Sequence, residues 1–162
     1  MSNPYTGLVT SALRKSQLLA TSSYDSSIQR MALEEGALLQ LWKAYQAFLA
    51  ELSHQLQLSF EPESVQVILD SLHSQGRASL EVSELQLLLS EPESWLSELL
   101  RAWNQLLRLP TLAEEKGQAG NLIPTHNIAG TVPIELSFEA LLKWHKALSE
   151  LILRQRANLE EC

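Results

Sequence analysis

The stretch from Asp25 to Leu58 constrains the fold most, because it contains no proline and repeats its large apolar side chains at helical spacing. At about 100° per residue, nine of these side chains fall within roughly 120° of one another. They are Met31, Leu38, Leu41, Trp42, Tyr45, Phe48, Leu49, Leu52 and Leu56. The opposite, polar face collects Gly36, Gln40, Lys43, Ala47, Glu51, His54 and Gln57. One helix of this length spans about 50 Å, so the sequence predicts an elongated molecule with other helices packed along the apolar face.

Four further segments have helical periodicity. They are Tyr5 to Ser22, Glu61 to Gln75, Glu91 to Leu109 and Ser137 to Leu159, with a brief helical turn expected in SELQLLLS (83–90). Gly76 is placed to end the segment from Glu61 to Gln75, and Pro110 is placed to end the segment from Glu91 to Leu109. Capping-box spacing occurs at Ser26 with Gln29, Ser83 with Gln86 and Ser90 with Glu93.

The tetrapeptide EPES occurs twice, at 61–64 and 91–94. Because the flanking residues do not align, the two copies do not indicate a structural repeat. Proline and acidic side chains are both favourable in a first helical turn, so each copy is interpreted as the start of a helix.

The segment from Pro110 to Glu135 has no helical period and predicts a long loop. With this loop, residues 1–162 are expected to form one all-α domain: an elongated antiparallel bundle of four main helices with one short helix added. Low Gly and Pro content, six of each, agrees with helices rather than a sheet.

Charge and cysteine content narrow the function classes. The net charge is −7, and the 12 Lys and Arg residues are scattered, which argues against nucleic-acid binding. The single cysteine, Cys162, suits a reducing compartment. With no secretory signal pattern and no apolar run of about 18 residues, we expect a cytoplasmic protein that does not enter a membrane.

Catalytic and metal-binding patterns are sparse. Glu51 and His54 have the E-x-x-H spacing of a di-iron ligand pair, but the chain has no second copy and this pair lies on the predicted polar face. No G-x-S-x-G, C-x-x-C, H-E-x-x-H or phosphate-binding glycine loop is present, and His126 is a lone loop histidine. We therefore expect a protein that is not an enzyme and that has no cofactor and no metal.

Two polar residues fall on predicted apolar faces. Glu34 points into the stripe between Leu38 and Leu41, and His145 lies beside Leu141 and Leu148. One hypothesis pairs Glu34 with His145 across two helices and makes them the edge of a polar pocket, because a buried carboxylate must be paired or neutralised. The alternative is a histidine satisfied within the core and a glutamate that reaches solvent.

Trp95 and Trp144 lie at the margins of their helical stripes, where packing anchors are common. Tryptophan is also enriched at interface hot spots, so both are candidates for a partner-binding surface. Leu122, Ile123 and Ile128 give the second half of the loop enough apolar surface either to pack on the bundle or to dock a partner.

Three stretches, ALLQLWKAYQAFLAEL (37–52), EPESWLSELLRAW (91–103) and LILRQRANLEE (151–161), resemble a gammaproteobacterial family of small helical proteins that is known only as a domain of unknown function. The RQR segment is its most specific piece. The resemblance implies a bacterial, cytoplasmic, helical protein and supplies no catalytic residues.

Two function classes follow. The first is a non-enzymatic protein–protein interaction module that binds a protein partner or associates with itself as a homodimer. The second is a helical bundle that binds a small ligand or a metal in a pocket near Glu34 and His145.

Overall fold

The structure is a computed structural model that describes residues 2–109 and 132–160. Within these residues the chain is all-helical, with six helices and no strand. The helices are α1 (Thr6–Ala20), α2 (Ser27–Gln55), α3 (Val65–Ser74), α4 (Leu80–Ser90), α5 (Trp95–Leu106) and α7 (Phe138–Glu160). The all-α prediction is confirmed for this part of the chain.

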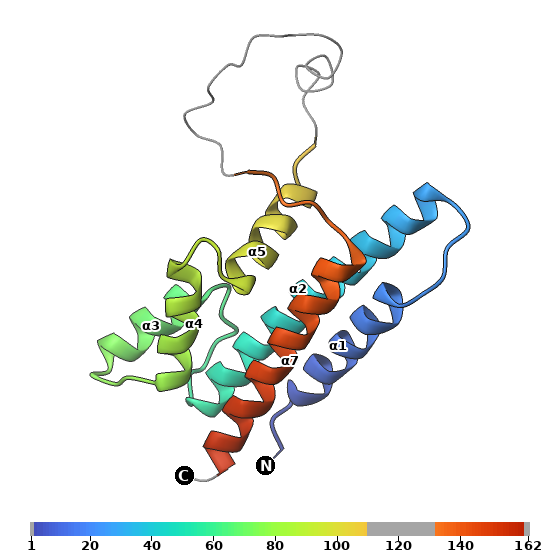
Figure 1. Cartoon of the computed structure of the whole chain (residues 1–162). Helices are drawn as coiled ribbons and strands as arrows, with labels where there is room; N and C mark the ends of the chain where they lie inside the picture. Colours follow the sequence, from blue (N-terminus) through green and yellow to red (C-terminus); the bar gives the residue numbers. More distant parts are fainter. Residues whose placement is uncertain (1, 110–131, 161–162) are drawn as a thin grey trace, which may run out of the picture.

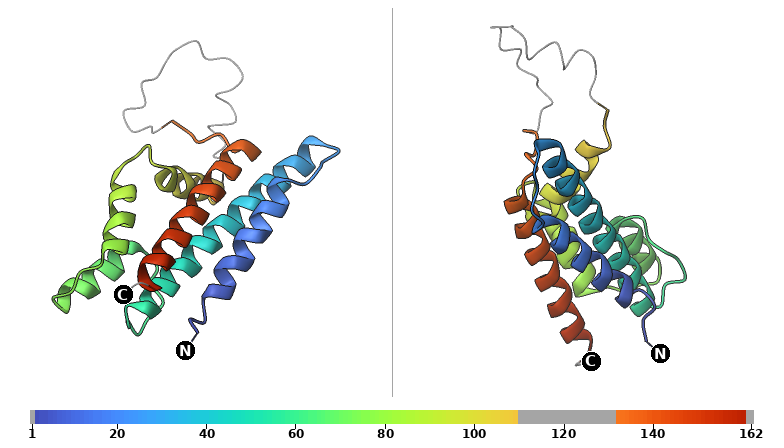
Figure 2. Two further views of the ribbon diagram at one scale, coloured as in Figure 1. Left: turned by 60° about the horizontal axis from the view of Figure 1, so that its bottom comes forward. Right: turned by 90° about the vertical axis from the view of Figure 1, so that its right-hand side faces the viewer.

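The three long helices α1, α2 and α7 run side by side, and the two chain ends lie at the same end of this group (Figures 1 and 2). α1 and α2 form an antiparallel hairpin, and α7 contacts both of them. α5 packs against α2 and α7, while α3 and α4 pair with each other and α4 contacts both α5 and, through Glu84, the end of α7. The arrangement differs from the expected one because α4 is a full helix of 11 residues and not a brief turn.

The long helix α2 is unbroken, as its periodicity predicts, and ends three residues before the expected Leu58. The Ser26 hydroxyl accepts a hydrogen bond from the Gln29 backbone N–H at 3.2 Å. In return, the Gln29 side chain accepts from the backbone N–H of Asp25 rather than from that of Ser26. Both ends of the capping interaction are thus present, with its second hydrogen bond moved by one residue.

Serine N-caps set the starts of the middle helices. In both EPES copies the proline lies before the helix, and the last residue is the cap: Ser64 accepts from Val67, and Ser94 accepts from Ser97. The predicted capping boxes at Ser83 and Ser90 are wrong, because α4 begins after Ser79 and ends at Ser90. Gly76 follows α3 with a positive φ of 64°, which confirms its predicted role as the helix stop.

The buried surface of α2 is wider than the predicted stripe, because α1, α5 and α7 pack on different sides of it. Glu51, which the helical wheel places on the polar face, is only 1% exposed. At the other end, Met31 is 50% exposed, because the first turns of α2 extend beyond the end of α1. α1 ends near Gly36, where Leu19 approaches α2 closely. The remaining stripe residues supply much of the core, including Leu38, Leu41, Tyr45, Phe48, Leu49 and Leu52.

Candidate functional site

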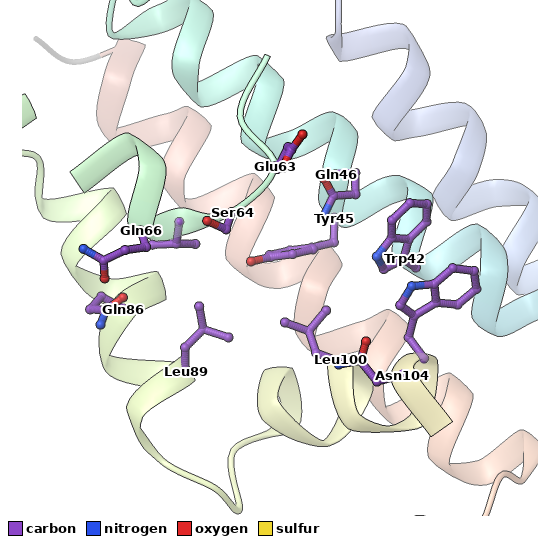
Figure 3. A pocket seen from close by; sticks show the side chains of 12 residues that line it. Trp42, Tyr45, Gln46, Glu63, Ser64, Gln66, Gln86, Leu89, Leu100 and Asn104 are labelled. Carbon is purple, nitrogen blue, oxygen red and sulfur yellow. The ribbon is translucent and has the colours of Figure 1, made fainter. Parts of the chain in front are cut away.

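A groove lies between α2, α3, α4 and α5, with a cavity volume of about 550 Å³ (Figure 3). This volume is within the range of roughly 300–1,000 Å³ that ligand sites commonly have. We call it the aromatic groove and define it by the residues that line it. They are Trp42, Tyr45, Gln46, Glu63, Ser64, Val65, Gln66, Gln86, Leu89, Leu100, Trp103 and Asn104. The groove is open to water, because Gln66, Gln86 and Asn104 are all exposed.

Two indole rings close one part of the groove. Trp42 of α2 and Trp103 of α5 stack with ring centroids 4.6 Å apart and an interplanar angle of 15°. Both side chains are half-buried. Stacked aromatic pairs add about 0.5–1.5 kcal/mol beyond the area they bury, so this pair fixes α5 on α2 and makes a rigid aromatic wall.

Tyr45 brings a polar group to the bottom of the groove. The residue is 2% exposed, and its hydroxyl makes no hydrogen bond within the described ranges 2–109 and 132–160. Figure 3 shows the ring extending from α2 with the hydroxyl directed into the groove, between Ser64 and Leu100. Burial raises the pKa of this hydroxyl well above its ordinary value, so the group is neutral and can both donate and accept.

The remaining polar lining consists mostly of amides. Gln46, Gln66, Gln86 and Asn104 come from four different helices, and the one charged lining residue is Glu63. No Lys, Arg or His lines the groove. Amides donate and accept hydrogen bonds but transfer no protons near neutral pH, so this lining favours binding over catalysis.

A second polar cluster lies at the end of α7 and is formed by the RQR segment. Arg156 donates two hydrogen bonds to the Glu51 carboxylate, at 2.9 and 2.8 Å, and Thr6 of α1 donates a third. Arg154 pairs with Glu84 of α4. Three consecutive residues of α7 thereby contact two helices, because Arg154 and Gln155 contact α4 and Arg156 contacts α2.

The Gln155 amide donates to the carbonyl of Glu81 at 3.3 Å and to the Glu84 carboxylate at 3.1 Å. Its own oxygen is buried and has no partner within the part of the chain that the structure describes. The RQR segment, which carries much of the sequence resemblance, therefore joins α7 to α2 and α4.

Glu34 and His145 have separate partners. Glu34 is 4% exposed and pairs with Arg30 on its own helix at 3.3 Å. The Nε2 atom of His145 lies 3.1 Å from the Leu13 carbonyl oxygen of α1, which can only accept, so Nε2 carries the proton. Among the hydrogen bonds and ion pairs of residues 2–109 and 132–160, none joins Glu34 to His145.

The register between α2 and α7 explains this separation. The two helices run parallel, since Tyr24 contacts Phe138 at their starts and Arg156 meets Glu51 near their ends. Counting eleven residues back along α7 brings His145 level with Gln40, about 9 Å along α2 from Glu34. The aromatic groove also excludes both residues, although it does include Tyr45.

Lowering the pH should reduce the stability of the fold, because the pKa of His145 is lowered in the folded state. Burial lowers the pKa of this imidazole, and the hydrogen bond to Leu13 opposes that change. The ordinary pKa of histidine is about 6.5. Below this pH the unfolded chain binds a proton at His145 more readily than the folded chain does. The free energy of unfolding therefore decreases as the pH falls from about 6.5 toward the lower pKa of the folded state. The denaturation midpoint should drop more between pH 7.5 and 5.5 in wild type than in His145→Gln. Equal drops would contradict this role of His145.

The predicted interaction residues lie in different environments. Trp144 is 1% exposed and donates its indole N–H to Glu98 at 3.1 Å, so it belongs to the core and not to a surface of the folded chain. Trp95 is half-buried at the start of α5. Leu122, Ile123 and Ile128, like His126 and most of the predicted 110–135 loop, lie outside the described residues.

The groove residues Trp42 and Tyr45 lie on the predicted apolar face of α2, where core side chains are expected. Helical spacing shows which side of a helix faces its neighbours but cannot show where the neighbours leave space. The one available signal is compositional, because two aromatic rings and an amide side chain lie within one stretch of five residues of α2, at Trp42, Tyr45 and Gln46.

A family model described as a family of unknown function (DUF6586) matches residues 12–162. No curated protein and no solved structure matches the chain. Within residues 2–109 and 132–160, no group of three or more His, Cys, Asp or Glu side chains could hold a metal ion. None of the helices described has the length and apolar character that crossing a membrane requires.

Proposed function

We propose, from the premise that this chain belongs to the DUF6586 family of unknown function, that it is a non-enzymatic interaction module of the bacterial cytoplasm. In this proposal the aromatic groove binds a segment of a partner protein. The single cysteine, Cys162, is compatible with a reducing compartment. The elongated bundle of long helices serves as a rigid support for the groove.

The Tyr45 hydroxyl is the observation that carries the proposal. This hydroxyl has no hydrogen-bond partner within the described residues, and it faces the open groove instead of the dry core. A bound segment would supply the missing hydrogen bond while covering Trp42 and Leu89. The aromatic rings around it are of the residue types enriched at interface hot spots.

The alternative pocket near Glu34 and His145 receives less support. Each of the two residues has its own partner, and His145 is bonded to the backbone of α1. We therefore place the binding site at the aromatic groove and retain Trp95, on the same helix as Trp103, as a candidate for its periphery.

Affinity purification from the native cell tests the proposal when the wild-type chain and a variant with a blocked groove are used as separate baits. In Asn104→Arg, a long cationic side chain replaces an exposed residue of the groove wall and fills the opening. Proteins retained by the wild-type full chain should fall at least tenfold with this variant, as quantified by mass spectrometry. Light scattering on the same samples shows whether the partner is a second copy of the chain.

The matched control is Gln17→Arg, which makes the same change of charge at an exposed position of α1 away from the groove. This variant should retain the partner at the wild-type level. A partner that both variants retain equally would place the interaction elsewhere and overturn the proposal, as would the absence of any retained protein.

A further inference from the structure

We propose that the segment bound in the aromatic groove is extended, not helical, and that it carries a Lys or Arg whose cation lies against Trp42 beside Glu63. This inference rests on the proposed function and specifies the chemistry of the partner. It is independent of any partner's name.

The amide side chains indicate the extended conformation. Gln46, Gln86 and Asn104 line the groove on α2, α4 and α5, and their side chains make no hydrogen bond within the ranges that the structure describes. Each can pair with one backbone N–H and one backbone C=O. A partner helix has already used these backbone groups internally, whereas an extended segment leaves them free for a groove to bind.

The charge of the groove indicates the cation. Glu63 is exposed and is the one charged residue of the groove lining, and Gln66 of the lining donates to Asp70 at 2.7 Å. Between residues 59 and 107, which include α3, α4 and α5, the chain has eight Asp and Glu side chains but only two Arg and no Lys. Most of the net charge of −7 therefore comes from the part of the chain that forms three walls of the groove.

Besides the negative charge, Tyr45 and Trp42 offer the ligand a hydrogen-bonding group and an aromatic ring. The Tyr45 hydroxyl has no hydrogen-bond partner within residues 2–109 and 132–160 and is directed into the groove, so a ligand there can hydrogen-bond to it. Trp42 stacks on Trp103, is half-buried and lines the groove. An indole face and a nearby carboxylate together attract Lys and Arg, with the ring contributing about 0.5–2 kcal/mol.

Selection from a random twelve-residue peptide library displayed on phage tests this inference with the full-length chain. We expect the selected peptides to share a Lys or Arg and to lack helical spacing of apolar residues. Synthetic copies should bind Glu63→Gln about tenfold more weakly than wild type, as measured by calorimetry. Their affinity should also fall as salt is raised.

The second EPES copy offers a matched control. Glu93 has the same position in its copy as Glu63, is exposed, and does not line the groove. Glu93→Gln therefore makes the same change in net charge and should leave the affinity within twofold. Circular dichroism should show the same helix content for both variants, because both side chains are exposed at helix starts.

The outcomes separate this inference from the proposed function. If the selected peptides are neutral or acidic and the Asn104→Arg variant does not bind them, the groove remains a binding site but the proposed Lys or Arg of the ligand is wrong. If the selected peptides have apolar residues at helical spacing and the Asn104→Arg variant does not bind them, the proposed extended conformation is wrong. Equal loss in Glu63→Gln and Glu93→Gln would reduce the effect to net charge and overturn the local contact. If no selected peptide depends on Asn104, the proposed function itself fails.

Discussion

Replacing Arg156 by alanine should destabilise the fold by about 3–5 kcal/mol, because it leaves the Glu51 carboxylate buried without its cation. The Glu51 side chain is only 2% exposed, and Arg156 supplies two of its hydrogen bonds. Thr6 alone would remain as a donor, which cannot balance a desolvated charge. Urea denaturation monitored by circular dichroism measures the change in the free energy of unfolding.

Arg154→Ala is the control for this prediction. Arg154 and Glu84 are both substantially exposed, with side-chain exposures of 55% and 37%. Exposed pairs contribute about 0–1 kcal/mol, so this variant should lose no more than that. Glu51→Gln introduced into Arg156→Ala should recover part of the loss by removing the buried charge. Equal losses in the two arginine variants would show that Glu51 is not held by Arg156.

Trp144→Ala should cost about 3–5 kcal/mol, the range for removing a large aromatic side chain from a core. Trp144 is 1% exposed on α7, and its truncation also removes the hydrogen bond to Glu98. Trp95→Ala should cost less than half as much, because that ring is only partly buried. Chemical denaturation of the two variants gives both values.

The same pair of variants distinguishes packing from recognition. If Trp144→Ala kept wild-type stability but lost partner binding, Trp144 would be the interaction anchor that its position on the helical wheel suggests. We expect the opposite result, a marked loss of stability together with any loss of binding.

The existence of the helices could be predicted from the sequence more securely than their ends. A run of apolar residues at helical spacing is strong in α2, whose 29 residues are unbroken. In α4 the pattern is weak, because Leu80 and Leu87 are exposed while Val82 and Leu85 are buried. The capping-box spacing of Ser83 with Gln86 indicated a false start, since α4 begins four residues earlier, after Ser79, whose side chain accepts from the Val82 backbone N–H.

The surroundings of individual polar residues depend on the register between helices, which one sequence does not reveal. A helical wheel assigns Glu51 to water because its neighbours on the wheel are polar, whereas a distant arginine allows it to be buried. The same limit applies to Glu34 and His145, which lie on apolar faces but at different levels of the bundle. The groove likewise exists because α3, α4 and α5 leave space beside Tyr45.

The anchoring of α4 by the end of α7 has a mechanical consequence for the groove. Gln86 and Leu89 of α4 form one side of the opening, and Arg154 and Gln155 of α7 bind α4 through Glu84. The position of this side of the groove therefore depends on α7 residues that do not line the groove themselves.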